Sequence, residues 1–224
     1  MSSRAWPVVV AGAVLAVVVV GLGVLNPVRP ARISTDRLGP DSGEQVADYL
    51  GRARASLDDI SLEEPDRGEQ HWALVSLDAP MTASGLLETV GELRISQVLF
   101  QVPIDRVQTP IAAVPVAANP AAVLRAPAVA SARLATSGGI GNRQLQIAAY
   151  SAARLSEGCA CVVGAAVRGT LEQLTGLTAQ PTVRAVEALP ADAVSGAFAV
   201  SPLLPEHTTV VAPGPDDGPV PPLR

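Results

Sequence analysis

Lysine is missing from this chain of 224 residues: all sixteen basic residues are arginine, against 21 acidic residues, and the formal net charge is −5. An acidic chain argues against a general nucleic-acid binder, which needs a basic surface to neutralise phosphates. Aromatic residues are scarce too, with two each of Phe, Trp and Tyr, which excludes a long stacking platform for single strands. We therefore expect no nucleic-acid partner.

Cysteine and histidine are equally rare, with two of each, so a closed four-ligand zinc site would use all of them. The sequence contains no P-loop, no Gly-x-Ser-x-Gly elbow and no His-Glu-x-x-His motif. His71 and His207 stand at no recognised spacing from an acid and a nucleophile. Gly138-Gly139-Ile140-Gly141 lacks the third glycine of a dinucleotide turn. We expect no enzyme, with no catalytic residue, no cofactor and no metal.

An apolar run near the N-terminus, residues 8–25, holds no charged or strongly polar side chain. Eighteen helical residues rise about 27 Å, close to the hydrocarbon thickness of roughly 30 Å. A cleaved signal peptide has a shorter apolar region and a small-x-small cleavage site, of which Gly21-Leu22-Gly23 is a poor version. We predict a short tail (1–7) and an uncleaved transmembrane helix (8–25) that makes this a single-pass protein of the cell membrane.

The orientation of that helix is open to two interpretations. Arg29, Arg32 and Arg37 follow the span and only Arg4 precedes it, so the positive-inside rule points the large domain into the cytoplasm. Many exported domains, however, are tethered by an anchor of this kind, and the two cysteines suit an oxidising compartment. We predict that the domain is extracytoplasmic, against the arginine count.

The chain after the span divides into three parts. Residues 26–40 indicate a linker, residues 41–200 an α+β soluble domain, and residues 201–224 a Pro-rich tail with no core to join. The domain opens with a helix from Asp41 to about Leu57 at helical apolar spacing. Residues 58–69 are acidic; the oxygen spacing of a calcium loop is absent, so we expect a solvated loop.

Two β-α-β units follow. Strands at 71–77 and 92–102 flank a helix at 82–90, and strands at 159–167 and 183–188 flank a helix at 170–177. Between the units lies an Ala/Pro-rich insertion, residues 103–158, with an extended edge segment in 107–116 and helices that start at Pro120 and Asn142. Broken alternation at Ser96-Gln97 indicates a bulge or bend.

This pattern predicts a ferredoxin-like βαββαβ domain, with the helical insertion between strands 2 and 3, behind the N-terminal transmembrane helix. The first and third strands carry no charge inside them and should be central. The second strand holds Arg94, and the fourth holds Arg184 and Glu187. Charges are easier to place at a sheet edge, where they also block strand addition, so we expect these two strands at the edges.

Cys159 and Cys161 are the one candidate site. Period two on a strand points both thiols to the same face, about 6.5–7 Å apart at the Cα atoms, so a disulfide needs a local bend. The pair is either a redox or metal-contacting site, or a simple local disulfide or two small buried residues. No Lys, His or helix N-terminus adjoins them in sequence to lower a thiol pKa, which favours the structural interpretation.

A resemblance covers residues 159–189. The strand-glycine-helix run, the Leu171-x-x-Leu174 core and the Pro181-x-Val183-x-x-Val186-Glu187 run resemble the second half of the peptidase-inhibitor modules that serve as subtilisin propeptides. The whole chain resembles single-pass envelope proteins of unknown function from high-GC Gram-positive bacteria. We therefore predict a non-enzymatic, membrane-anchored envelope protein whose domain binds another protein; a thiol-disulfide redox protein and a propeptide-like protease inhibitor are the alternatives.

Overall fold

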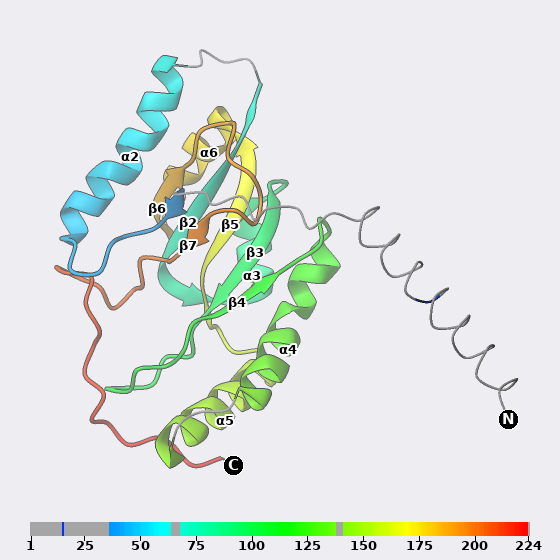
Figure 1. Cartoon of the computed structure of the whole chain (residues 1–224), viewed down its shortest axis with the longest axis vertical. Coiled ribbons are helices and arrows are strands. Elements are labelled where there is room, and N and C mark those ends of the chain that lie inside the picture. The colour runs from blue at the N-terminus through cyan, green and yellow to red at the C-terminus, as the bar shows by residue number, and fades with distance from the viewer. Residues whose placement is uncertain (1–14, 16–35, 64–67, 138–140, 224) are drawn as a thin grey trace, which may run out of the picture. The chain divides into compact units, whose positions relative to one another are not determined.

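The structure is a computed structural model that describes residue 15 and residues 36–63, 68–137 and 141–223 (Figure 1). The chain divides into two compact units, residues 1–33 and 34–224. The predicted tail 1–7, the predicted transmembrane helix 8–25 (Leu15 apart) and residues 26–35 of the predicted linker lie outside the described residues. Among the residues that are described, no helix is both long and apolar enough to cross a membrane.

The second unit is a mixed α+β domain, which confirms the predicted fold class at this level. Its described part has five helices: α2 (Val46–Glu63), α3 (Ala83–Val90), α4 (Pro120–Thr136), α5 (Asn142–Ser156) and α6 (Leu171–Thr178). Five strands form an antiparallel sheet: β2 (Gln70–Met81), β3 (Arg94–Phe100), β4 (Ala112–Pro115), β5 (Val162–Thr170) and β6 (Val183–Ala188). Two short strands, β1 (Arg37–Leu38) and β7 (Ala199–Val200), form a separate parallel pair.

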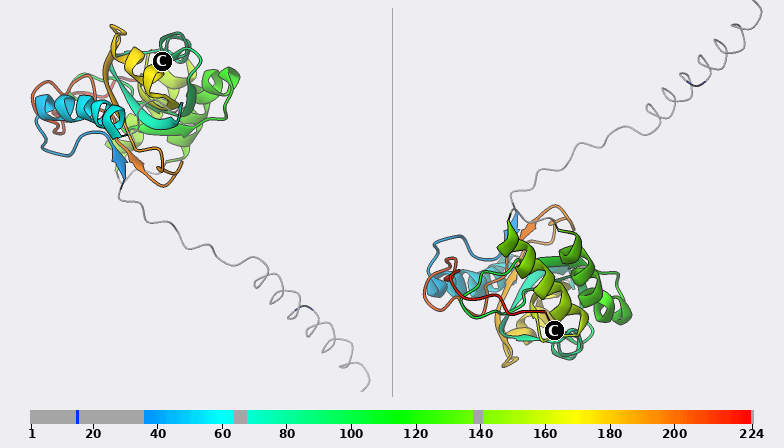
Figure 2. Two further views of the ribbon diagram at one scale, coloured as in Figure 1. Left: turned by 90° about the horizontal axis from the view of Figure 1, so that it is seen from above. Right: turned by 90° about the horizontal axis from the view of Figure 1, so that it is seen from below.

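The order of strands in the sheet is β4-β3-β5-β2-β6. It confirms that β2 and β5, the strands predicted to be central, lie inside the sheet and that β6 lies at an edge. The prediction that β3 is an edge strand is wrong, because the extended segment expected in 107–116 forms β4 and pairs with β3 from Gln97 to Phe100. In both views of Figure 2, α2 and α4 lie on opposite sides of the molecule, next to β6 and β4 respectively.

Period two along β2 sends alternate side chains to opposite faces of the sheet. Ala73, Val75 and Leu77 point to the face that the helices cover, which we call the first face. Apolar side chains of α3, α4, α5 and α6 pack there against the sheet, and Leu174 of α6 is fully buried. The insertion 103–158 therefore shares the main core, because α4 and α5 bury side chains in the same cluster as the β-α-β units.

The other face of the sheet, the second face, is covered by the two ends of the described chain. Leu38 of β1 and Leu204 pack there against Leu74 and Val163. The prediction that the Pro-rich tail has no core to join is wrong: Leu203, Leu204 and Val211 are buried. A tail of this composition is ordered here because apolar side chains spaced between the prolines reach the sheet and α2.

Local sequence signals account for several element boundaries. The side chain of Asn119 accepts a hydrogen bond from the Ala122 N–H and caps α4, with Pro120 at the first helical position as predicted. The predicted bulge is confirmed: the pairing of β3 with β5 shifts register between Ile95 and Gln97. Helix α2 starts at Val46, not Asp41, because residues 41–44 form a turn with Gly43 at a φ of 84°.

Candidate functional site

The cysteines predicted as the candidate site form a disulfide, Cys159–Cys161, with a Cα–Cα separation of 5.3 Å. The strand predicted to hold them begins only at Val162, so they lie in the bend between α5 and β5. That bend brings the Cα atoms closer than an extended strand allows, as the spacing argument required. Cys161 is buried in the main core and Cys159 is half-buried.

The other residues singled out from the sequence are scattered. The Nδ1 atom of the buried His71 lies 3.1 Å from the Leu189 carbonyl oxygen. Residues 138–140 of the glycine-rich run lie outside the described residues, and Gly141 precedes α5. The acidic segment 58–69 is not all loop, since α2 continues to Glu63; residues 64–67 are outside the described part. Among described residues, no three His, Cys, Asp or Glu side chains gather as a metal site would need.

A cleft of about 650 Å³ lies where three distant segments meet. Residues 101–111, between β3 and β4, form one wall, and residues 201–215 of the Pro-rich tail form the other. Pro40, Ser42 and Pro80 close the end. In Figure 1 the loop after β3 reaches across to the tail. Five of its lining residues are prolines, which have no backbone N–H to donate to a sheet.

Hydrogen bonds and ion pairs fasten the tail to that loop. The Arg106 guanidinium donates to Asp217, with Nε 2.8 Å from Oδ1, and the Gln108 amide donates to the Gly214 carbonyl oxygen at 2.6 Å. The Arg143 guanidinium donates to Asp216 at 2.9 Å, and this bond lowers the pKa of that carboxyl. Asp216 and Asp217 are both exposed, and each pairs with an arginine more than 70 positions away in the sequence.

Two of the three charged side chains that line the cleft, Asp105 and Glu206, are acidic. Glu206 accepts from the Gln101 amide at 3.2 Å, and Asp105 belongs to the opposite wall. The Leu204 N–H donates to Nδ1 of His207 at 3.3 Å, and burial lowers the pKa of this imidazole. Near neutral pH the ring is therefore neutral, with Nδ1 the acceptor and Nε2 carrying the proton. Ile111 adds an apolar side chain that is 41% exposed.

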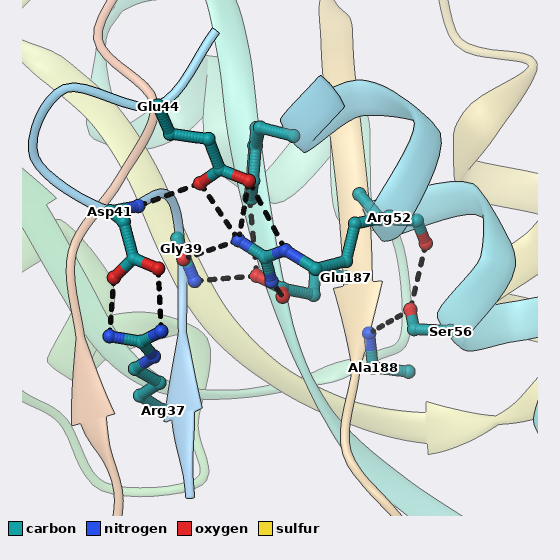
Figure 3. Close-up of polar contacts among 10 residues, drawn as sticks. Arg37, Gly39, Asp41, Glu44, Arg52, Ser56, Glu187 and Ala188 are labelled. Atoms are coloured by element: carbon teal, nitrogen blue, oxygen red, sulfur yellow. Dashed lines mark hydrogen bonds and ion pairs between the residues drawn. The ribbon is translucent and has the colours of Figure 1, made fainter. Parts of the chain in front are cut away.

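A second polar cluster joins the N-terminal segment, residues 36–45, to α2 and β6 (Figure 3). Its centre is Glu187 of β6, which is only 4% exposed. The Glu187 carboxylate accepts from the Gly39 N–H at 2.5 Å and the Tyr49 hydroxyl at 3.3 Å, and forms an ion pair with Arg52 of α2. The same guanidinium donates to Glu44 at 3.0 Å and to the Gly39 carbonyl oxygen at 3.2 Å.

The pKa values of the two carboxylates that share Arg52, Glu187 and Glu44, are shifted in opposite directions. Burial raises the pKa of Glu187 above its ordinary value, because loss of hydration outweighs the Gly39 N–H and the guanidinium. Burial also opposes ionisation of Glu44, but hydrogen bonds from Arg52 and the Asp41 N–H outweigh it and lower that pKa. Burial and the Glu187 charge together raise the pKa of Tyr49. This cluster fastens the N-terminal segment to α2 and β6.

Sequence reasoning missed both features for the same reason. Glu187 was correctly predicted to lie on an edge strand, but nothing local in the sequence shows that α2 covers that edge. The Ala188 N–H on the outer side of β6 donates to the Ser56 hydroxyl at 3.0 Å, so α2 also satisfies the backbone there.

Comparisons with protein-family models, with curated proteins and with solved structures found no match.

Proposed function

We propose that this chain is a non-enzymatic, membrane-anchored envelope protein whose extracytoplasmic domain binds a segment of another protein. The apolar run at 8–25 supplies the anchor. The Cys159–Cys161 disulfide supports an oxidising compartment, since such bonds are rare where thiols are kept reduced. The domain in this proposal is ferredoxin-like. The strands of the two β-α-β units support this, because they lie in the order β6-β2-β5-β3. The elements β4, α4 and α5 belong to the insertion between β3 and β5.

The observation that carries the proposal is the cleft between residues 101–111 and 201–215. Its walls are extended, proline-rich chain rather than the closed apolar pocket that small ligands favour. Two of its charged side chains, Asp105 and Glu206, are acidic and form no ion pair with an arginine among the described residues, while Arg106 is paired with Asp217. We commit to an extended peptide segment that carries a basic side chain, seated with that side chain near Glu206 and an apolar one on Ile111.

The chemistry of the cleft favours binding over catalysis. His207 is its only imidazole among the lining residues, and a backbone N–H occupies Nδ1. A general base of the triad type needs a carboxylate on that nitrogen to hold the tautomer and to stabilise the imidazolium. Burial moreover lowers the pKa of His207, which weakens it as a base.

The test is site-specific photo-crosslinking in intact cells. A benzophenone amino acid at Ile111, in the cleft, is compared with the same group at Leu124 of α4, which is 53% exposed and does not line the cleft. We expect one discrete adduct from position 111 and none from position 124. Glu206→Lys should abolish the adduct by charge repulsion, whereas Glu88→Lys, a charge reversal on exposed α3, should leave it unchanged.

Equal adducts from positions 111 and 124, or an adduct that survives Glu206→Lys, would refute the cleft as the binding surface. The side of the membrane is tested separately with a reporter active only in the cytoplasm, fused after Arg224. We expect it to be silent; a strong signal would restore the orientation that Arg29, Arg32 and Arg37 favour. The two alternatives stay predictions. Loss of function when both cysteines are replaced would reveal a redox protein. A tight complex with a subtilisin-like protease would reveal a protease inhibitor.

A further inference from the structure

Three side chains form a row across the second face of the sheet. Trp72 of β2 is directly opposite Arg168 of β5, and Arg168 is directly opposite Arg94 of β3. Directly opposite side chains share one face, so the three lie side by side on neighbouring strands. Both guanidinium groups lie against the same indole, with Cζ 5.3 Å from the ring centroid for Arg168 and 5.8 Å for Arg94.

This arrangement places two positive charges next to each other without a negative partner. Neither guanidinium forms an ion pair or hydrogen bond with any other described residue, and Nε of Arg168 is buried without a partner. Like charges directly opposite on a sheet repel, and a buried N–H without an acceptor is costly. The Trp72 ring offsets only part of this through its attraction for cations. An anion between the two guanidiniums would satisfy both.

We propose that Arg94 and Arg168 bind a phosphoryl group on the platform of Trp72. A phosphoryl group carries up to two negative charges and three acceptor oxygens, which matches two guanidinium forks better than the single charge of a carboxylate. Arg94 is exposed and Arg168 is half-buried, so the group approaches over Arg94 and reaches the buried Nε behind it. This site shares no residue with the cleft, and only its lipid source, discussed next, rests on the membrane anchor proposed above.

Two sources of that group are compatible with the position of the site. The ring of Phe198 lies 6.0 Å from Trp72, and the Ala199 N–H donates to the Asp36 carbonyl oxygen at 3.2 Å, so the row adjoins the start of the described domain. The ten residues 26–35 that precede it span at most about 36 Å when extended. An anionic phospholipid headgroup is therefore within reach of a chain anchored at 8–25, as is free phosphate.

The experiment uses the full chain in lipid nanodiscs. The chain has two tryptophans, so Trp6→Phe leaves Trp72 as the sole source of tryptophan emission. One arm titrates inorganic phosphate, against sodium chloride of equal ionic strength, into discs of phosphatidylcholine. The other arm compares phosphatidylcholine discs with discs that contain phosphatidylglycerol, without phosphate. We expect a change in Trp72 emission in at least one arm, and the responding arm identifies the source.

The arginine variants decide whether the response belongs to this row. Arg94→Gln removes an exposed side chain and should weaken the response about tenfold or more, as loss of one charge-assisted pair predicts. Arg168→Gln should do the same, and Arg125→Gln, an exposed arginine of α4, should behave as the parent. No emission change in either arm, or an equal response from Arg94→Gln, Arg168→Gln and Arg125→Gln, would overturn the proposal.

Discussion

The ion pair between Arg52 and Glu187 gives the sharpest test of how the N-terminal segment is held. Arg52→Met keeps most of the aliphatic stem but leaves the Glu187 carboxylate buried with only the Gly39 N–H and the Tyr49 hydroxyl as donors. Breaking a fully buried pair costs about 3–5 kcal/mol. The Arg52 side chain is 40% exposed and that of Glu187 6%, so water replaces part of the lost interaction. We expect a loss of about 2–3 kcal/mol in unfolding free energy.

A double-mutant cycle separates the pair from its surroundings. Glu187→Gln keeps an acceptor for the Gly39 N–H and leaves Arg52 paired with Glu44, so it should cost only about 1 kcal/mol. With the charge gone, Arg52→Met should cost much less in the Glu187→Gln background, which gives a coupling energy of about 1.5 kcal/mol or more. Urea unfolding of the full chain in mild detergent, followed by Trp72 emission in a Trp6→Phe background, measures all four corners.

The same variants predict a pH dependence. Because the folded-state pKa of Glu187 is raised, the folded protein holds this proton more tightly than the unfolded chain does. Its contribution to stability is fully present below the ordinary pKa of a glutamate and is lost as the pH rises through the raised value. Glu187→Gln should therefore gain stability relative to the parent as the pH rises over that window.

Two results would refute this account of the ion pair between Arg52 and Glu187. One is that the costs of the two single variants simply add in the cycle. The other is that Arg52→Met costs no more than Arg54→Met, a change at an exposed arginine of the same helix.

Three further predictions concern packing and are checked by the same urea unfolding. Leu174→Ala should cost about 2–5 kcal/mol because the side chain is fully buried, whereas Leu145→Ala, at a position 48% exposed, should cost under about 0.5 kcal/mol; equal costs would mean that α6 does not pack as described. Replacing both Cys159 and Cys161 with Ala should cost under about 2 kcal/mol, since closing so short a loop removes little chain entropy; outright unfolding would contradict this. Gly164→Ala should destabilise because its Cβ would lie 2.7 Å from the Val75 carbonyl oxygen, while Gly176→Ala in α6 should stabilise by about 0.5–1 kcal/mol because nothing lies within 4 Å of the added methyl; similar signs for the two would contradict the geometry.

Most elements of the domain could be predicted from local pattern. Strand β6 matches the predicted range 183–188, and Asn119-Pro120 marks the start of α4, because periodicity and capping act over a few residues. The break in alternation at Ser96-Gln97 found the register shift in β3 for the same reason. What local pattern could not predict is which segments meet. The second partner of β3 and the cover over β6 depend on contacts with segments far along the chain.

The cleft and the buried cluster were out of reach for that reason. Arg52 and Glu187 are 135 residues apart, and Arg106 and Asp217 are 111 apart. Each of these side chains has an ordinary local environment in the sequence, so a solvated interpretation was the natural one. The tail was also misjudged from composition: proline content argued for an extended, unattached chain, but Leu203 and Val211 supply enough apolar surface to attach it.

The two ends of the described chain are joined to each other as well as to the sheet. β1 pairs in parallel with β7, Gln45 bridges to Val210, and the Gly39 N–H binds Glu187 of the sheet itself. Gly39 has a φ of 111°, and a Cβ there would lie 1.6 Å from the Ser201 carbonyl oxygen, so the two segments touch backbone to backbone. Residues 36–40, the end of the predicted linker, are therefore part of the folded domain, and they connect the chain that precedes them to β6 and to the C-terminal segment. The N-terminal segment also contributes Pro40 and Ser42 to the cleft, so the predicted anchor would attach to the same segment that forms part of the proposed binding surface.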